Sequence, residues 1–267
     1  MPQLKYEKLI NILKDMKKVA IAFSGGVDSA FLLKAALDAL SRENVLAITI
    51  ESQVITEAEM RDLKKQIEFF KARHRVIKTD ILSLTEFKDN SSERCYFCKK
   101  YLFQKIIKAA KAENYNIILD GTNADDEGDF RPGIKALKEL SIRSPLKECS
   151  LNKNDIRELS KTLGLITYDK PSLACLASRI PYGEEITEDK LRMVEKAEDY
   201  LRNLGFRQFR VRHHNLIARI EIESEDFLKI FENGLNIKIN DYFKTLGFKY
   251  ITLDLMGFRT GSLNEVL

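Results

Sequence analysis

A short apolar run that leads directly into a serine- and glycine-rich turn constrains the fold of this chain more than any other feature. Val19–Phe23 is apolar throughout, which is the pattern of a strand buried on both faces of a sheet. The turn that follows, Ser24–Ser29, reads Ser-Gly-Gly-Val-Asp-Ser, and apolar residues at helical spacing come after it. Its two glycines let the backbone approach an anion closely, and a helix N-terminus adds free N–H groups and a positive dipole end. The segment therefore predicts a phosphate-binding loop, although plain strand-Gly-Gly-helix connectors also exist.

Strands and helices alternate along the first part of the chain. Further apolar runs predict strands at Val45–Ile50, His74–Ile77 and Asn116–Asp120. Apolar residues at helical spacing predict helices at residues 4–16, 57–71 and 98–112. This alternation is the signature of an α/β fold with a doubly wound parallel sheet.

The periodicity breaks near residue 170, and a smaller α+β domain is expected after the break. Its expected elements are a helix capped by Thr187 and stopped by Gly205, strands at Phe209–His213 and Ile217–Glu223, a helix from about Glu225, and a strand at Tyr250–Leu255. The expected division is an α/β domain at residues 1–170, a connecting loop at 171–185 that carries Cys175, and an α+β domain at 186–267.

The composition of the chain argues against several classes of protein. Among its 267 residues, 44% are hydrophobic and 31% are charged, and the formal net charge is +4. Charges of both signs are interspersed, so a nucleic-acid surface is not expected. No apolar run is long enough to cross a bilayer, and the N-terminus lacks the layout of a leader peptide. These features favour a cytoplasmic protein of two modest domains whose partner is a small molecule.

The glycine-rich turn is not a Walker A loop, because it lacks the Gly-Lys-Ser/Thr ending. It resembles the PP-loop of the N-type ATP pyrophosphatases, in which ATP is cleaved between its α- and β-phosphates and a substrate oxygen is adenylated. The resemblance implies ATP and Mg²⁺, which would neutralise the leaving pyrophosphate. Glu51 and the string Asp120–Asp126 follow other predicted strands, at the edge where a parallel sheet binds nucleotide. The residues expected to bind ATP are Ser24, Gly25, Gly26, Val27, Asp28, Ser29, Glu51, Gly121, Thr122 and Lys99.

Three of the four cysteines suggest a metal or sulfur site. Cys95 and Cys98 form a CxxC pair, and a zinc site would need further ligands although no second CxxC is present. Three thiolates, from this pair and the distant Cys175, could hold three irons of a [4Fe–4S] cluster and leave the fourth iron open for sulfide. In a rival interpretation, Cys175 is a lone nucleophile that gives up its own sulfur. The residues themselves leave both interpretations open, and Cys149 is treated as incidental.

Longer strings along the chain resemble a single family. They are Asp129–Gly133, Ser178–Gly183, Arg210–Asn215, Ala218–Glu221 and Thr252–Arg259. In these strings the chain is similar to the LarE family, ATP-dependent sulfur transferases that mature the nickel-pincer nucleotide of lactate racemase. The resemblance implies that a pyridinium biscarboxylate mononucleotide is adenylated and that its carboxylates become thiocarboxylates. It also implies a homo-oligomer, and the sulfur source stays open between sulfide and a donor protein.

The resemblance also implies roles for individual residues. In some family members the cysteine that matches Cys175 donates its own sulfur and becomes dehydroalanine, and those members lack the CxxC pair. Because Cys95 and Cys98 are both present, the chain resembles the branch with a three-cysteine [4Fe–4S] cluster. The substrate phosphate is expected at Ser178, Arg179, Arg210 and Arg212, and Glu198, Glu221 and Asp226 are expected near the reacting group, around a divalent metal.

Three alternative functions are compatible with a PP-loop. A tRNA thiolase uses the same loop and a similar cluster, but the chain has no basic RNA-binding extension or paired zinc motifs. A non-catalytic iron–sulfur or nucleotide sensor would bind ATP without turnover. An amidotransferase-type synthetase would use ammonia against the adenylate, and the chain shows no glutaminase domain.

Overall fold

A computed structural model describes residues 1–126, 132–171, 174–259 and 261–266 of the chain. The chain forms two compact units, and each unit takes two stretches of sequence. The first unit is Met1–Asp80 with Cys95–Leu173, and the second is Ile81–Arg94 with Ala174–Leu267. Asp129–Arg131, which begins one of the strings that carry the family resemblance, lies outside the described residues.

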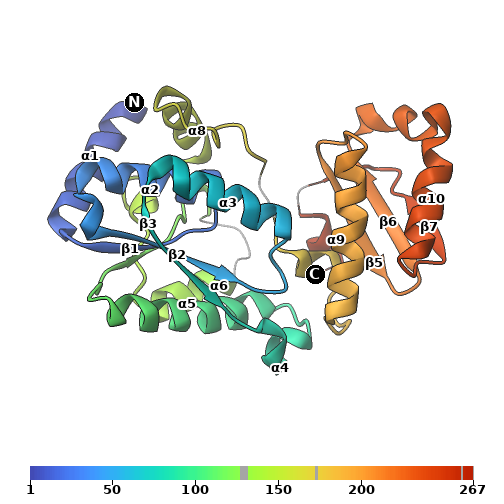
Figure 1. Ribbon diagram of the computed structural model, residues 1–267, viewed down its shortest axis with the longest axis horizontal. Coiled ribbons are helices and arrows are strands. Elements are labelled where there is room, and N and C mark those ends of the chain that lie inside the picture. The colour runs from blue at the N-terminus through green and yellow to red at the C-terminus, as the bar shows by residue number, and fades with distance from the viewer. Residues whose placement is uncertain (127–131, 172–173, 260, 267) are drawn as a thin grey trace. The chain divides into compact units, whose positions relative to one another are not determined.

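The first unit contains a four-stranded parallel sheet, which confirms the predicted α/β class (Figure 1). Its strands are β1 (Val19–Ala22), β2 (Val45–Glu51), β3 (Arg73–Lys78) and β4 (Ile118–Leu119). The strand order β3-β2-β1-β4 reverses direction at β1, which makes the sheet doubly wound. The last strand is shorter than the predicted Asn116–Asp120, because its outer neighbour is only an irregular segment that pairs at Arg143.

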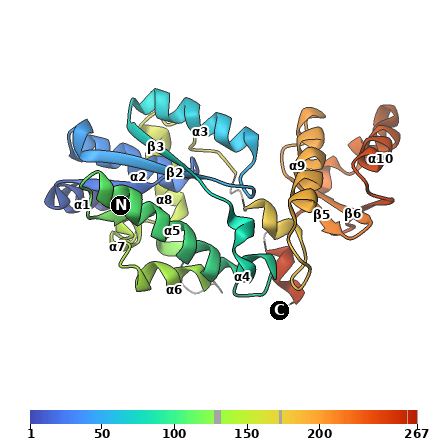
Figure 2. The same ribbon diagram turned by 60° about the horizontal axis from the view of Figure 1, so that its bottom comes forward.

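Helices cover both faces of this sheet. They are α1 (Pro2–Met16), α2 (Val27–Ala39), α3 (Glu57–Phe70), α5 (Arg94–Ala112), α6 (Pro132–Glu139), α7 (Pro145–Glu148) and α8 (Lys153–Thr162). Alternate residues of β1 enter different cores: Val19 and Ile21 pack with α1, α2 and α8, whereas Ala20 packs with α5 and α6. Figure 2 shows α5 and α6 on one side of the strands and α3 on the other. Burial on both faces explains why these strands read as continuous apolar runs.

The second unit is built on a three-stranded sheet. It contains α4 (Thr85–Lys88), α9 (Glu188–Asn203), β5 (Phe209–His214), β6 (Ile217–Ile222), α10 (Leu235–Thr245) and β7 (Tyr250–Leu253). The order is β5-β6-β7, antiparallel and then parallel. The predicted Thr187 cap is confirmed, since its hydroxyl accepts the N–H of Lys190 at 3.3 Å. One apolar face of the sheet packs on α9 and α10, and the opposite face carries the charged side chains of β5 and β6.

Two predicted elements of this unit were wrong in their bounds. The helix expected from about Glu225 is instead a pair of 3-10 segments, Ser224–Asp226 and Leu228–Gly234, before α10. Asn233 and Gly234 have φ values of 51° and 69°, which no continuous right-handed helix accepts. The strand expected to reach Leu255 ends at Leu253, because Asp254 turns the chain there and accepts the N–H of Met256.

Short 3-10 helices connect several of these elements. They lie at Arg42–Asn44, Ile81–Ser83, Ala124–Asp126, Leu176–Arg179 and Ser262–Val266. Among the helices that the structure describes, none combines the length and the apolar character needed to span a membrane.

Candidate active site

The predicted phosphate loop joins β1 to α2, and a side chain of α3 holds its backbone by a hydrogen bond. Gly25 has a φ of 69°, and a Cβ at this position would lie 3.3 Å from the amide nitrogen of Gln66. The same amide donates a hydrogen bond to the carbonyl of Gly25 at 2.9 Å. Gly25 is therefore needed both for its backbone conformation and for this close packing.

The hydroxyl groups of the loop gather at the start of α2. The Oγ atoms of Ser24 and Ser29 are 3.1 Å apart, and the Ser29 hydroxyl donates to the carbonyl of Gly26 at 3.1 Å. Gly26 is the N-cap residue and brings no side-chain oxygen to the first N–H groups of α2. Such N–H groups, together with the helix dipole, suit an anionic phosphate.

A second loop, after β4, meets the phosphate loop where the strand order reverses. A Cβ at Gly121 would lie 3.1 Å from the backbone nitrogen of Ser29, a tight contact that glycine avoids. The Asn123 amide donates to the Asp28 carboxylate at 3.3 Å, and Lys153 forms an ion pair with the same carboxylate. Sequence reasoning missed Lys153, because α8 lies far along the chain. These contacts place Gly121 and Asp28 together at the edge where parallel sheets bind nucleotides.

Thr122, in the same loop, donates its hydroxyl hydrogen bond to the carboxylate of Asp120. Asp120 is buried and also accepts a hydrogen bond from Ser144. The polar side chains of this loop are therefore held by one another, as expected for a rigid turn at the end of a strand.

Glu51 lies beside a hollow of about 640 Å³ at the carboxyl ends of β2 and β3. Lys78 is 3.4 Å from the Glu51 carboxylate, and Arg61 and Lys64 also line the hollow. The buried hydroxyl oxygen of Ser52 has no hydrogen-bond partner among the residues described. Glu57 and Asp80 line the hollow as well, so its acidic and basic side chains balance, and the unsatisfied Ser52 hydroxyl suits it to a polar ligand.

Lys99 is placed by α5 against α6 rather than by the phosphate loop. A Cβ at Gly133 would lie 2.8 Å from the Cδ atom of Lys99, so the glycine permits the lysine stem to cross α6. The side chain of Lys99 is half-buried in this position.

The cysteines are divided between the two units. Cys95 and Cys98 are half-buried near the start of α5 in the first unit, whereas Cys175 is exposed in the second. Cys149 is buried, and burial raises the pKa of its thiol, which fits its incidental role. Within the described stretches of the chain, no three or more His, Cys, Asp or Glu side chains are grouped as metal ligands.

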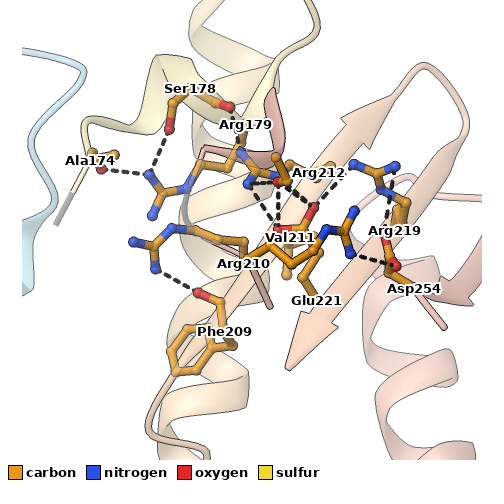
Figure 3. Close-up of polar contacts among 12 residues, drawn as sticks. Ala174, Ser178, Arg179, Phe209, Arg210, Val211, Arg212, Arg219, Glu221 and Asp254 are labelled. Atoms are coloured by element: carbon orange, nitrogen blue, oxygen red, sulfur yellow. Dashed lines mark hydrogen bonds and ion pairs between the residues drawn. The ribbon is translucent and has the colours of Figure 1, made fainter. Parts of the chain in front are cut away.

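In the second unit, Arg210 and Arg212, two of the arginines predicted to bind a phosphate, lie on the charged face of β5 (Figure 3). Alternation suggests a half-exposed surface, but Arg210 and Arg212 are only 7% and 6% exposed, and Glu221 is fully buried. Arg212 donates to both oxygens of Glu221, at 2.9 and 2.8 Å, and to the Ser178 carbonyl at 2.7 Å. It also donates to the hydroxyl of Ser262, a residue that sequence reasoning missed. Arg212 and Glu221 thus form a bidentate buried pair.

Arg179 and Glu198 form a second bidentate pair beside β5. Their contacts measure 2.9 and 2.8 Å, and Glu198 also accepts the N–H of Val211 at 3.0 Å. Burial raises the pKa of Glu198, but the Arg179 charge outweighs it and holds that pKa below its ordinary value. Arg179 also donates to the carbonyls of Ala174 and Cys175 and to the hydroxyl of Ser178. This geometry fits Arg179 to positioning the Cys175 segment better than to direct contact with a phosphate.

Arg210 lies between these two pairs. Burial, together with the charge of Arg179, lowers the pKa of Arg210 to about 10. Its guanidinium donates to the Phe209 carbonyl at 2.6 Å and lies 5.1 Å from the centre of the Phe258 ring. The charged residues of this network are Arg179, Arg210, Arg212, Arg219, Arg259, Glu198, Glu221, Asp254 and Glu265, five positive and four negative. The surplus positive charge favours an anionic ligand.

Asp226 is separate from the paired carboxylates. It belongs to the 3-10 helix Ser224–Asp226, is half-buried, and donates its backbone N–H to the carbonyl of Glu223 at 2.9 Å. Among the described residues, its carboxylate makes no hydrogen bond or ion pair with the arginines of this face. The structure therefore joins Glu198 and Glu221 to arginines and leaves Asp226 outside that network.

Comparison with known proteins identifies the family of the chain. A model of the NAD synthase family matches residues 7–127, which contain the phosphate loop. A protein of Lactiplantibacillus plantarum named pyridinium-3,5-bisthiocarboxylic acid mononucleotide synthase is 40% identical over 266 residues, 98% of this chain and 95% of that protein. The chain belongs to the LarE family. The predicted resemblance to LarE is thereby confirmed.

Two further relatives of this LarE-family chain span almost its whole length. An uncharacterized protein of Synechocystis is 41% identical over 267 residues, 100% of this chain and 99% of that protein. An uncharacterized protein of Methanocaldococcus jannaschii is 35% identical over 259 residues, 96% of this chain and 98% of that protein. The similarity therefore includes both compact units, and not the phosphate-loop region alone.

Proposed function

We propose that this LarE-family enzyme uses ATP and Mg²⁺ to adenylate a carboxylate of a pyridinium biscarboxylate mononucleotide and then converts it to a thiocarboxylate. The observation that carries the proposal is the 40% identity, over 98% of the chain, to the bisthiocarboxylic acid mononucleotide synthase. The phosphate loop supports it, because Gly25 and Gly121 leave room that a Cβ would fill. Adenylation makes chemical sense, since it turns a poor leaving oxygen into AMP.

The residues of the first unit would bind ATP in this proposal. The N–H groups at the start of α2 and the hydroxyls of Ser24 and Ser29 would hold the phosphates. Asp28 is fixed by Lys153 and Asn123, so its carboxylate is held at one place beside the loop. Mg²⁺ would neutralise charge on the leaving pyrophosphate. Glu51 and the basic residues beside the hollow would contact the rest of the nucleotide.

The residues of the second unit would bind the phosphate of the mononucleotide. Arg210 and Arg212 lie two residues apart on β5, and the surplus positive charge of their network favours a dianion. The half-buried Ser178 adds a hydroxyl beside Arg179. Glu198 and Glu221 hold the arginines in place. A divalent metal would bind near these two carboxylates and Asp226.

The thiols of Cys95, Cys98 and Cys175 would hold the [4Fe–4S] cluster. The donor set fits in chemical type, because three thiolates leave one iron open. When bound, such a cluster would supply sulfide to the activated carbon. Cys175 is exposed, and Arg179 donates a hydrogen bond to its carbonyl.

Two measurements on anaerobically purified protein test the proposal. With ATP and the biscarboxylate mononucleotide, we expect pyrophosphate release and the mass gain of an oxygen-to-sulfur exchange in the product. Release that depends on tRNA, or ATP binding with no turnover, would instead favour a thiolase or a sensor. Iron and acid-labile sulfide should approach four atoms each per chain and fall in Cys175→Ala. Iron-free protein that gains dehydroalanine at Cys175 would favour the sacrificial route.

A further inference from the structure

The segment Ile81–Arg94 is separated in sequence from the rest of the second unit, yet it packs there. Two polar residues of this segment, Asn90 and Arg94, are 0% and 2% exposed. Buried polar side chains of this kind are held by hydrogen bonds or they destabilise the fold. Both form hydrogen bonds with the loop Ala174–Glu184, which contains Cys175.

Asn90 gathers three carbonyls of that loop with one amide group. Its Nδ2 donates to the carbonyls of Ile180, Pro181 and Glu184, at 3.3, 2.7 and 2.9 Å. Its own φ is 54°, a left-handed conformation that asparagine tolerates better than most residues. Its backbone carbonyl accepts the N–H of Gly183 at 3.0 Å. Both the side chain and the backbone of Asn90 therefore form hydrogen bonds with the loop.

Arg94 extends the same contact toward Cys175. One of its terminal nitrogens donates to the carbonyl of Ala177 at 3.1 Å and to the side-chain oxygen of Asn90. Its guanidinium lies 4.8 Å from the centre of the Tyr182 ring. Among the described residues, no carboxylate pairs with Arg94, and its Nε–H has no hydrogen-bond partner. A buried guanidinium without a counter-charge is unusual, because desolvation disfavours it.

Chain connectivity links this cation to the cysteines. Cys95 follows Arg94 directly, so their Cα atoms are about 3.8 Å apart. Ala177, whose carbonyl Arg94 holds, is two residues after Cys175. Arg94 is thus the neighbour of one proposed ligand, Cys95, in the chain. It also forms a hydrogen bond two residues from another proposed ligand, Cys175.

The geometry points to Asn90 and Arg94 as positioning residues for Cys175, and to the Arg94 charge as the partner of the thiolate or cluster charge. The assignment of the charge rests on the proposed cluster, whereas the positioning role does not. Neither residue needs to touch the substrate. Asn90 sets the course of the loop, and Arg94 fixes the carbonyl of Ala177, two residues after the cysteine.

Four variants test the inference. Arg94→Met removes the charge and the hydrogen bond, and Arg94→Lys keeps the charge. Asn90→Gly removes the amide but accepts the left-handed backbone. Arg73→Met controls for the loss of an arginine elsewhere, because Arg73, on β3 of the first unit, also donates to a carbonyl, that of Glu43, but is exposed and paired with Glu113.

Hydrogen exchange of the iron-free proteins tests the positioning role without the cluster. The amides of Ser178, Ile180, Gly183 and Glu184 are hydrogen-bonded within or next to the loop. We expect them to exchange about tenfold or more faster in Arg94→Met and in Asn90→Gly, the factor for losing one hydrogen bond of a charged or buried group. Unchanged exchange in both, or an equal change in Arg73→Met, overturns the positioning role.

Reconstitution with iron and sulfide tests the role of the charge. Arg94→Met should hold less iron than wild type, and any cluster it holds should have a lower reduction potential, while Arg94→Lys keeps the wild-type potential. If Arg94 were only structural, the reduction potential of the cluster would not depend on whether residue 94 is charged. Equal potentials in all three overturn the charge role. Wild-type protein that takes up no iron overturns the cluster and the charge role together, and the exchange result still decides the positioning role.

Discussion

The buried pair Arg179–Glu198 allows a quantitative test of how the second unit is held together. Both side chains are 4% exposed, and the carboxylate also accepts the N–H of Val211. Removing one member of such a pair typically costs about 3–5 kcal/mol, because the other charge stays buried alone. Loss of the carboxylate also leaves a buried N–H unpaired, at about 1–3 kcal/mol. We expect Arg179→Met and Glu198→Met each to lower the free energy of unfolding by about 3–5 kcal/mol, Glu198→Met by the larger amount.

The double variant separates the loss of charge pairing from the loss of packing. Apolar replacement of both partners of a buried pair is often close to neutral. The double variant should therefore be at least about 2 kcal/mol more stable than the sum of the single effects predicts. The chain has no tryptophan, so urea unfolding would be followed by far-UV circular dichroism.

An exposed ion pair on the same helix provides the control. Asp199 pairs with Arg202 on the surface of α9, where both side chains are more than one third exposed. Asp199→Asn should change the free energy of unfolding by less than about 1 kcal/mol, since exposed pairs contribute little. Strictly additive effects of Arg179→Met and Glu198→Met, or an Asp199→Asn effect as large as theirs, would refute the reasoning.

Three further predictions follow from described contacts. The pKa of Glu198 lies below its ordinary 4.5, so its contribution to stability is present above about pH 4.5 and is lost as the pH falls further. Acid unfolding, measured by circular dichroism, should therefore be less steep in Glu198→Met than in wild type. In Gly121→Ala the added Cβ meets Ser29, so ATP affinity measured by calorimetry should fall about tenfold or more, and an unchanged affinity would contradict this site. Arg210→Met should raise the KM for the mononucleotide about tenfold with a smaller effect on kcat, and equal KM values would exclude phosphate binding by Arg210.

Much of the first unit could be predicted because its local signals agree with its tertiary environment. The strands at Val19–Ala22 and Val45–Glu51 are buried on both faces, which requires the continuous apolar runs seen in the sequence. Gly25 of the phosphate loop is needed for its positive φ, so its role can be predicted without any knowledge of the neighbours. The same holds for Thr187, whose cap is a contact within a few residues.

Features that depend on distant segments could not be predicted. Alternation places Arg210 and Arg212 on one face, but it does not reveal that Leu176–Arg179 and Ser262 cover that face. The membership of Ile81–Arg94 in the second unit depends on hydrogen bonds to residues far later in the chain. The roles assigned to Cys175, Asp226 and the phosphate-binding arginines stay predictions, because they concern ligands rather than the fold.

The interleaving of the two units along the chain has a consequence for folding during synthesis. Asn90 is made 91 residues before Pro181, and Arg94 is made 83 residues before Ala177. At typical translation rates their partners emerge from the ribosome roughly 5 to 20 seconds later. Cys95 and Cys98 therefore leave the ribosome well before Cys175. Contacts of such long range in sequence also form slowly. A nascent chain that stops before residue 177 holds two cysteines next to an arginine that has no loop to bind.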